Sequence, residues 1–211
     1  MFTSRTRIIL SATGIAVALF VAGCGDDSGS SATPSGSTAA GTSEMPGMHH
    51  GGPSSSTAPT RTDFDDADVT FLQLMYPHHA QAVEMAKLVP SRSQNQQLIA
   101  LAAAVEQAQA PEMQQFTELL SAFGKPAPTA MGHDMPGMMS HDQMTGLQNA
   151  TGAEFDRMWM RMMIDHHRGA IDMANTELAQ GVNPDAQRLA RGIVAAQEAE
   201  IQQMQGMLGQ S

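Results

Sequence analysis

Cysteine is almost absent from the chain, with Cys24 as the only one in 211 residues. A disulfide framework and a cysteine-based metal site are therefore both excluded. Aromatic residues are also few, with one Trp, one Tyr and seven Phe. Lys and Arg number 11 against 21 Asp and Glu, and the formal net charge is −10. So acidic a chain lacks the basic surface that nucleic-acid binding needs, which excludes nucleic acid as a partner.

The N-terminal apolar run, residues 8–21, is too short for a membrane span, which needs about 20 apolar residues. It follows two arginines and ends in Val21-Ala22-Gly23-Cys24, which resembles a lipobox. The pattern predicts a lipoprotein signal peptide over residues 1–23, with an uncleaved N-terminal anchor as the alternative. Cleavage removes two arginines and no acid, which takes the net charge from −10 to −12. We therefore expect an extracytoplasmic protein anchored to the membrane by a lipid on Cys24.

Residues 24–61 are rich in Ser, Gly and Thr and have too few apolar side chains to fold, so we predict a flexible tether. The tether carries the sequence Met45-Pro-Gly-Met48-His49-His50. The remaining residues, 62–209, are enough for one domain with its own core. Methionine is the most unusual component, with 18 in the chain.

The chain matches itself without gaps at an offset of 88 residues. Residues 71–120 lie over residues 159–208, and 15 of these 50 positions are identical. A match of this kind indicates duplication of one structural unit. We place the first unit at 62–123, a connection at 124–150 and the second unit at 151–209.

Each unit is predicted to form two helices. In the second unit, Thr151 with Glu154 is a candidate capping box, Gly181 a helix end, and Asn183-Pro184-Asp185 the start of the last helix, which we expect to reach about Gly209. In the first unit, the first helix is predicted to start in the acidic segment 63–68 and to end at Pro90, and Asn95 is predicted to cap the second helix. Pro77 and Pro111 fall inside these two helices. The predicted fold is all-α, a four-helix bundle of ferritin-like type made from the two units.

Helical spacing puts a His-His pair on the apolar face of each unit. His78 continues the core stripe of Phe71, Leu74, Ala82 and Met85, while His79 lies on the neighbouring line with Met75 one turn away. The second unit repeats the pattern with Trp159, Met162, Met163, His166, His167, Ala170 and Met173.

One glutamate interrupts the apolar stripe of each partner helix. Glu112 follows Leu101, Val105 and Ala108 and precedes Phe116 and Leu119; Glu200 holds the matching place among Leu189, Ile193, Ala196, Met204 and Met207. A carboxylate in a core needs a cation or hydrogen-bond donors. In one interpretation, His78–Glu112 and His166–Glu200 are buried structural pairs and the methionines fill space. In the other, imidazole, thioether and carboxylate converge on a metal, and the thioether favours Cu(I).

The connection repeats this chemistry outside the predicted helices. It contains Met131, His133, Met135, Met138, Met139, His141 and Met144. We expect no core there for methionine to fill. Methionines with interspersed histidines, and no cysteine, are typical of a copper or silver site in an oxidising compartment. A low-complexity linker is the alternative.

The motif HH-x-x-A-[VI]-[ED]-M-A, found twice, together with Q-x-x-E-[IM]-Q-Q, resembles the domain of unknown function 305 family over about residues 62–209. Members resemble ferritin-like four-helix bundles, are typically secreted or lipid-anchored, and some are linked to copper binding and tolerance. The resemblance implies that eight residues matter: Met75, His78, His79, Met85, Met163, His166, His167 and Met173. Pro77 stands where the second copy has Asp165, which makes the two sites unequal.

These patterns together predict a non-enzymatic protein that binds copper, and silver in vitro, for sequestration, tolerance or handover to a delivery partner. A ferritin-type di-metal oxidase or peroxidase is a rival, although its Glu-x-x-His motif does not occur in the chain. A metal-free interaction domain at the cell surface is the third possibility. The sequence does not determine the oligomeric state.

Overall fold

The structure, a computed structural model, describes residues 61–129 and 135–209. This part of the chain is all-helical, with five helices and no strand. Four helices are long and one is short: α1 (Asp66–Arg92), α2 (Gln96–Ala122), α3 (His141–Asn149), α4 (Gly152–Gln180) and α5 (Pro184–Leu208). No helix in the described ranges is long and apolar enough to cross a membrane. The predicted signal peptide, Cys24 and all of the tether except Arg61 lie outside these ranges.

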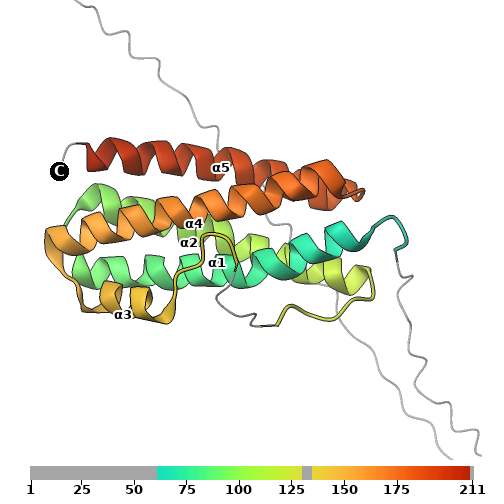
Figure 1. Cartoon of the computed structure of the whole chain (residues 1–211), viewed down its shortest axis with the longest axis horizontal. Coiled ribbons are helices and arrows are strands. Elements are labelled where there is room, and N and C mark those ends of the chain that lie inside the picture. The colour runs from blue at the N-terminus through green and yellow to red at the C-terminus, as the bar shows by residue number, and fades with distance from the viewer. Residues whose placement is uncertain (1–60, 130–134, 210–211) are drawn as a thin grey trace, which may run out of the picture. The chain divides into compact units, whose positions relative to one another are not determined.

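Helix α1 packs along α2, and α4 packs along α5, as Figure 1 shows. The two pairs meet mainly through α1 and α4. The turns within the pairs are short, because α2 starts four residues after α1 ends and α5 starts four residues after α4 ends. Each pair is therefore antiparallel.

Capping residues set most helix ends. The side chain of Asn95 accepts hydrogen bonds from the N–H groups of Gln97 and Leu98, and Asn183 does the same at the start of α5. Three predictions are confirmed: the N-caps at Asn95 and Asn183 and the end of α4 at Gly181. Two others were wrong. Thr151 precedes α4 but makes no side-chain capping bond, and α1 continues past Pro90 to Arg92.

The buried apolar side chains form two clusters. The Trp159 cluster includes Ala82, Met85, Val89, Leu98, Val105, Phe155, Trp159, Met163 and Met204. The Phe116 cluster includes Phe71, Leu72, Met75, Phe116, Leu120, Ala170, Ala174, Ala190 and Ile193. Helices α1 and α5 run from the Phe116 cluster to the Trp159 cluster, while α2 and α4 run the opposite way. Every long helix therefore contributes to both clusters.

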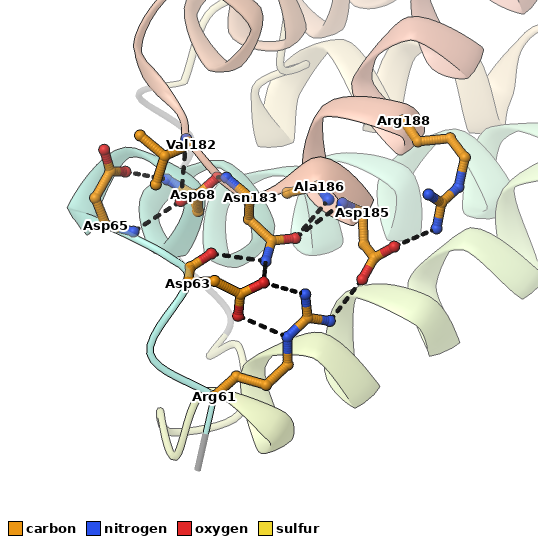
Figure 2. A network of polar contacts seen from close by, with 9 residues as sticks. All are labelled: Arg61, Asp63, Asp65, Asp68, Val182, Asn183, Asp185, Ala186 and Arg188. Atoms are coloured by element: carbon orange, nitrogen blue, oxygen red, sulfur yellow. Dashed lines mark hydrogen bonds and ion pairs between the residues drawn. The ribbon is translucent and has the colours of Figure 1, made fainter.

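A network of polar contacts joins the start of α1 to the turn between α4 and α5 (Figure 2). Asp65 and Asp68 form a capping box, in which each carboxylate accepts a backbone N–H of the other residue. Asp68 is fully buried and also accepts the N–H of Asn183 at 2.9 Å. Arg61 bridges Asp63 and Asp185. The first turn of α1 is thus fixed to the second helix pair.

The connection contains a helix that we did not predict. Ser140 caps α3 in a capping box with Gln143. Met144 and Leu147 are buried and belong to the Trp159 cluster. The connection is therefore partly structured and contributes to the core.

Candidate metal centre

A layer of buried polar side chains separates the two apolar clusters. It consists of His78, His79, Gln109, His166, His167 and Gln197, and each member is at most 3% exposed. In each long helix, these residues lie between the segment in the Phe116 cluster and the segment in the Trp159 cluster. We call this group the polar layer.

The inner imidazoles, His78 and His166, lie against each other at the centre of the layer. Their ring centroids are 3.8 Å apart with an interplanar angle of 38°. One ring comes from α1 and the other from α4, so the structure brings together one histidine from each copy of the motif.

The outer imidazoles, His79 and His167, each bond to a glutamate of the partner helix. His79 Nε2 is 2.8 Å from Glu112 Oε2, and His167 Nε2 is 2.6 Å from Glu200 Oε2. The two pairs are related by the 88-residue offset. The predicted pairs His78–Glu112 and His166–Glu200 were therefore wrong. The glutamates were also expected in the core, yet their side chains are 21% and 16% exposed.

Hydrogen bonding determines which imidazole nitrogens keep a lone pair. A carboxylate and a carbonyl oxygen can only accept, so Nε2 of His78, His79 and His167 is the donor in these contacts. The neutral rings of His78 and His79 therefore keep a lone pair on Nδ1. The nitrogens His78 Nδ1, His79 Nδ1, His166 Nδ1, His166 Nε2 and His167 Nδ1 are buried without a hydrogen-bond partner. Burying such atoms unpaired is unfavourable, which calls for an explanation such as a ligand.

Burial keeps His78, His79 and His166 neutral. Desolvation, with a contribution from the neighbouring His79, lowers the pKa of His78 to about 3. Desolvation also lowers the pKa of His79, although Glu112 opposes the shift, and lowers that of His166 well below its usual value. Neutral imidazole is the form that binds metals, so no proton has to leave these rings first.

A short segment of the connection, residues 135–139, crosses α1 and α4 beside the inner imidazoles. We call it the strap. His78 Nε2 donates to the Pro136 carbonyl at 3.1 Å. Gln81 donates to the Met139 carbonyl at 2.9 Å and accepts the Met139 N–H at 2.7 Å. The strap is therefore held on α1 by three hydrogen bonds.

Two glycines allow the strap to lie directly on α4. A Cβ on Gly169 would overlap the Pro136 carbonyl, and a Cβ on Gly137 would lie 2.6 Å from the Asp165 carbonyl oxygen. Gly137 also has φ +77°, which a side chain would strain. Only glycine at both positions permits this approach.

The predicted methionine donors of the helices occupy different environments. Met75, Met85 and Met163 are fully buried. Met75 and Met163 each precede an outer histidine by one turn, whereas the Met85 carbonyl accepts the Trp159 indole N–H at 2.9 Å. Met173 is half-buried and lines a groove together with Pro136 of the strap.

The connection residues divide into three groups. Met135 and Met138 are half-buried in the strap, and His141 is exposed at the start of α3. Met139 and Met144 are buried in the Trp159 cluster, so the expectation that methionine had no core to fill there was wrong for these two. Met131 and His133 lie outside the described residues, as does Met45-Pro-Gly-Met48-His49-His50 of the tether.

Sequence reasoning missed the two glutamines of the polar layer. Gln109 and Gln197 are each 3% exposed, and each has a buried amide oxygen without a partner. They lie 88 positions apart and one turn before the two glutamates, so the internal match contained the signal that identifies them.

The layer does not hold a metal with histidine and carboxylate alone. Within residues 61–129 and 135–209, no three His, Cys, Asp or Glu side chains are grouped so that they could hold a metal ion. A site with three or more ligands would therefore need donors of another kind, and thioether sulfur is one that the surrounding residues offer. Imidazole combined with thioether suits Cu(I) and other soft ions.

Comparison with known proteins identifies the family of this chain. The profile of the family described as Domain of unknown function (DUF305) matches residues 68–208. A DUF305 fragment from Deinococcus radiodurans is 34% identical, with a TM-score of 0.65, over 70% of this chain and 98% of that one. A DUF305 protein of Streptomyces coelicolor, named as a secreted protein, is 32% identical, with a TM-score of 0.64, over 68% and 93%. Comparison with curated proteins gave no match.

A third similar structure is CopM in its Cu(I)-bound form. It is 28% identical, with a TM-score of 0.59, over 68% of this chain and 96% of that one. CopM has also been solved in Cu(II)-bound and Ag-bound forms. The profile match covers two thirds of the sequence, and two of these structures exceed 30% identity over nearly their whole length. This chain therefore belongs to the DUF305 family.

Proposed function

We propose that this protein binds copper outside the cytoplasm through imidazole and thioether donors, for sequestration, tolerance or handover and without catalytic turnover. The observation that carries the proposal is the set of five buried imidazole nitrogens that lack a partner. Their rings come from both helix pairs and lie within one layer of the core. A soft cation bound by two of these rings would satisfy one nitrogen of each ring.

The outer glutamates support this assignment as orienting groups. A metal-binding histidine commonly donates its other ring N–H to a carboxylate, which fixes the ring and strengthens the ligand. Glu112 and Glu200 hold His79 and His167 in this way, and Nδ1 of each ring remains free. In this proposal they act through the histidines instead of binding the metal themselves.

The relatives provide the choice of metal. CopM binds Cu(I), Cu(II) and Ag, and the donor types of the present chain suit the monovalent ions. Within the same proposal, the four long helices form a four-helix bundle of two repeated units, and a lipid on Cys24 anchors the protein to the membrane.

Titration of Cu(I) against a competing chelator tests the proposal. We expect the mature chain to take up copper at micromolar metal, and a His78/His79/His166/His167→Ala variant to lose most of this binding. His141→Ala, which removes an exposed imidazole of the connection, measures how much that histidine adds to the binding. No uptake by the wild type would contradict the proposal, and iron-dependent oxygen consumption would instead support an oxidase. Far-ultraviolet circular dichroism reports whether the quadruple variant retains its helices.

A further inference from the structure

The strap contains a tight turn with a methionine at each end. The Met138 N–H donates to the Met135 carbonyl at 3.1 Å, with Pro136 and Gly137 between them. Pro at the second position and a glycine with φ +77° at the third are the pattern of a type II β-turn. Such a turn places the Cα atoms of Met135 and Met138 within about 7 Å of each other. Both side chains remain half-buried, unlike the buried Met139.

The turn lies against the backbone that carries an inner histidine. A Cβ on Gly137 would lie 2.9 Å from the His166 carbonyl oxygen and 3.0 Å from the Gly169 Cα. On the other side, the Pro136 carbonyl accepts the hydrogen bond from His78. The turn therefore contacts the His78 ring on α1 and the backbone of His166 on α4, and it is not a free loop.

His166 is the inner histidine with more ring nitrogens that lack a hydrogen-bond partner. Both of its ring nitrogens are buried without a partner, whereas His78 uses Nε2 to hold the strap. The two rings are in contact, so a ligand at one is close to the other.

We propose that the strap and the inner histidines form one composite site for a monovalent soft cation, with Met135, Met138 and His166 as donors. His78 is a positioning residue, because its hydrogen bond to Pro136 seats the turn. The inference rests on the proposed copper binding and deepens it: Met135 and Met138 of the strap and His166 of α4 belong to one site instead of two.

Ag(I), which is diamagnetic and stable to oxidation, is the probe for the first test. In the mature chain labelled with 13C at the methionine methyl groups and with 15N at histidine, we expect Met135, Met138 and His166 signals to change together during the first equivalent of Ag(I). Changes at different equivalents would show two separate sites and would overturn the composite site.

The second test compares Ag(I) affinities of matched variants. Met135→Leu/Met138→Leu should weaken binding about tenfold or more, which corresponds to about 1.4 kcal/mol. Met113→Leu/Met158→Leu removes the same number of thioethers from α2 and α4 and should bind as the wild type does. Binding by Met135→Leu/Met138→Leu as tight as that of the wild type would overturn the composite site and leave the proposed function intact. No binding by the wild type would overturn both.

A third variant tests the position of the strap on α4 separately from the presence of its methionine donors. Gly169→Ala adds a Cβ that overlaps the Pro136 carbonyl, so the turn must move while both methionines remain. We expect this variant to lose affinity as well. Gly192→Ala, which meets nothing within 4 Å, is its control. Unchanged affinity in Gly169→Ala would show that the seating of the turn has no part in the site.

Discussion

The outer histidines depend on carboxylates that lie closer to the surface than the imidazoles they hold. His79 and His167 are fully buried, whereas Glu112 and Glu200 are partly exposed. Each glutamate therefore supplies an acceptor to a buried N–H without itself losing all contact with water. This arrangement lowers the cost of placing a polar ring inside the core.

Glu200→Ala tests this dependence. Loss of the acceptor leaves the His167 Nε2–H buried and unpaired, which should lower the free energy of unfolding by about 1–3 kcal/mol. The exposed Glu198, two residues away, provides the control, and Glu198→Ala should change stability by less than about 0.5 kcal/mol. Urea unfolding measures both. Equal stabilities of the two variants would show that the His167–Glu200 contact contributes nothing to the fold.

A buried carboxyl group, Glu177, should make stability depend on pH. Burial, followed by the nearby carboxylate of Asp68, raises the pKa of Glu177 to about 8 from its ordinary value of 4.5. The folded state thus binds this proton more tightly than the unfolded chain does. The free energy of unfolding should therefore be highest below pH 4.5, as far as this group is concerned, and should fall as the pH rises through about 8.

Glu177→Gln keeps a neutral side chain of the same size and should remove this decline. At pH 9 the free energy of unfolding of the variant should exceed that of the wild type by on the order of 1–2 kcal/mol, after allowance for water that reaches Glu177 and Asp68. Thermal unfolding at several pH values measures the difference, with the exposed Glu118→Gln as the control. A parallel pH dependence of Glu177→Gln and the wild type would contradict the assignment.

At the scale of the elements, the packing of the strap on α4 depends on the absence of a side chain at Gly169. Gly169→Ala improves helix propensity by about 1 kcal/mol, yet it places a methyl group against the Pro136 carbonyl. We expect a net loss of stability of about 1–3 kcal/mol from the displaced backbone. In contrast, Gly192→Ala should raise stability by about 0.4–1 kcal/mol. Chemical denaturation that ranks the two variants in the opposite order would contradict the close packing of the strap on α4.

The helices could be predicted from sequence because their ends carry local signals. Asn95 and Asn183 are N-caps whose side chains act within their own turn, so no knowledge of the fold was needed. Helix α3 carries an equally local signal, with Ser140 three residues before Gln143. It lies in a segment rich in methionine and histidine, which was predicted to be a copper site outside the helices, with a low-complexity linker as the alternative.

The contacts between helices could not be predicted in the same way. The predicted buried face of α2 included the apolar Ala108 and Leu119, whereas the structure buries Gln109 and Leu120 instead. Because Leu101, Val105 and Phe116 belong to both stripes, the buried face is rotated toward Gln109 and Leu120 by less than the roughly 100° that separates successive residues. The rotation brings Glu112 to the edge of the core, where it meets His79. Ala196 and Gln197 repeat this error in α5. Hydrophobicity alone misplaces a face whenever a buried position is polar.

For the whole molecule, a metal that binds only the folded state should act as a stabiliser. At a free Ag(I) concentration about a hundredfold above the dissociation constant, the free energy of unfolding should rise by about 2.7 kcal/mol. Differential scanning calorimetry with and without Ag(I) measures the shift in Tm, and a chelator should reverse it. An unchanged Tm at saturating metal would show that folded and unfolded chains bind equally.

The division of the core into two clusters also bears on how the protein unfolds. Each long helix is continuous through the polar layer, so neither cluster can lose its packing without exposing half of all four helices. Two separate apolar clusters should therefore give a single cooperative transition, with equal calorimetric and van't Hoff enthalpies. Two resolved transitions would mean that the helices break at the layer. The polar layer is the part of the core that is least favourable to bury. Because the helices are continuous through it, this layer is also where the two clusters are joined.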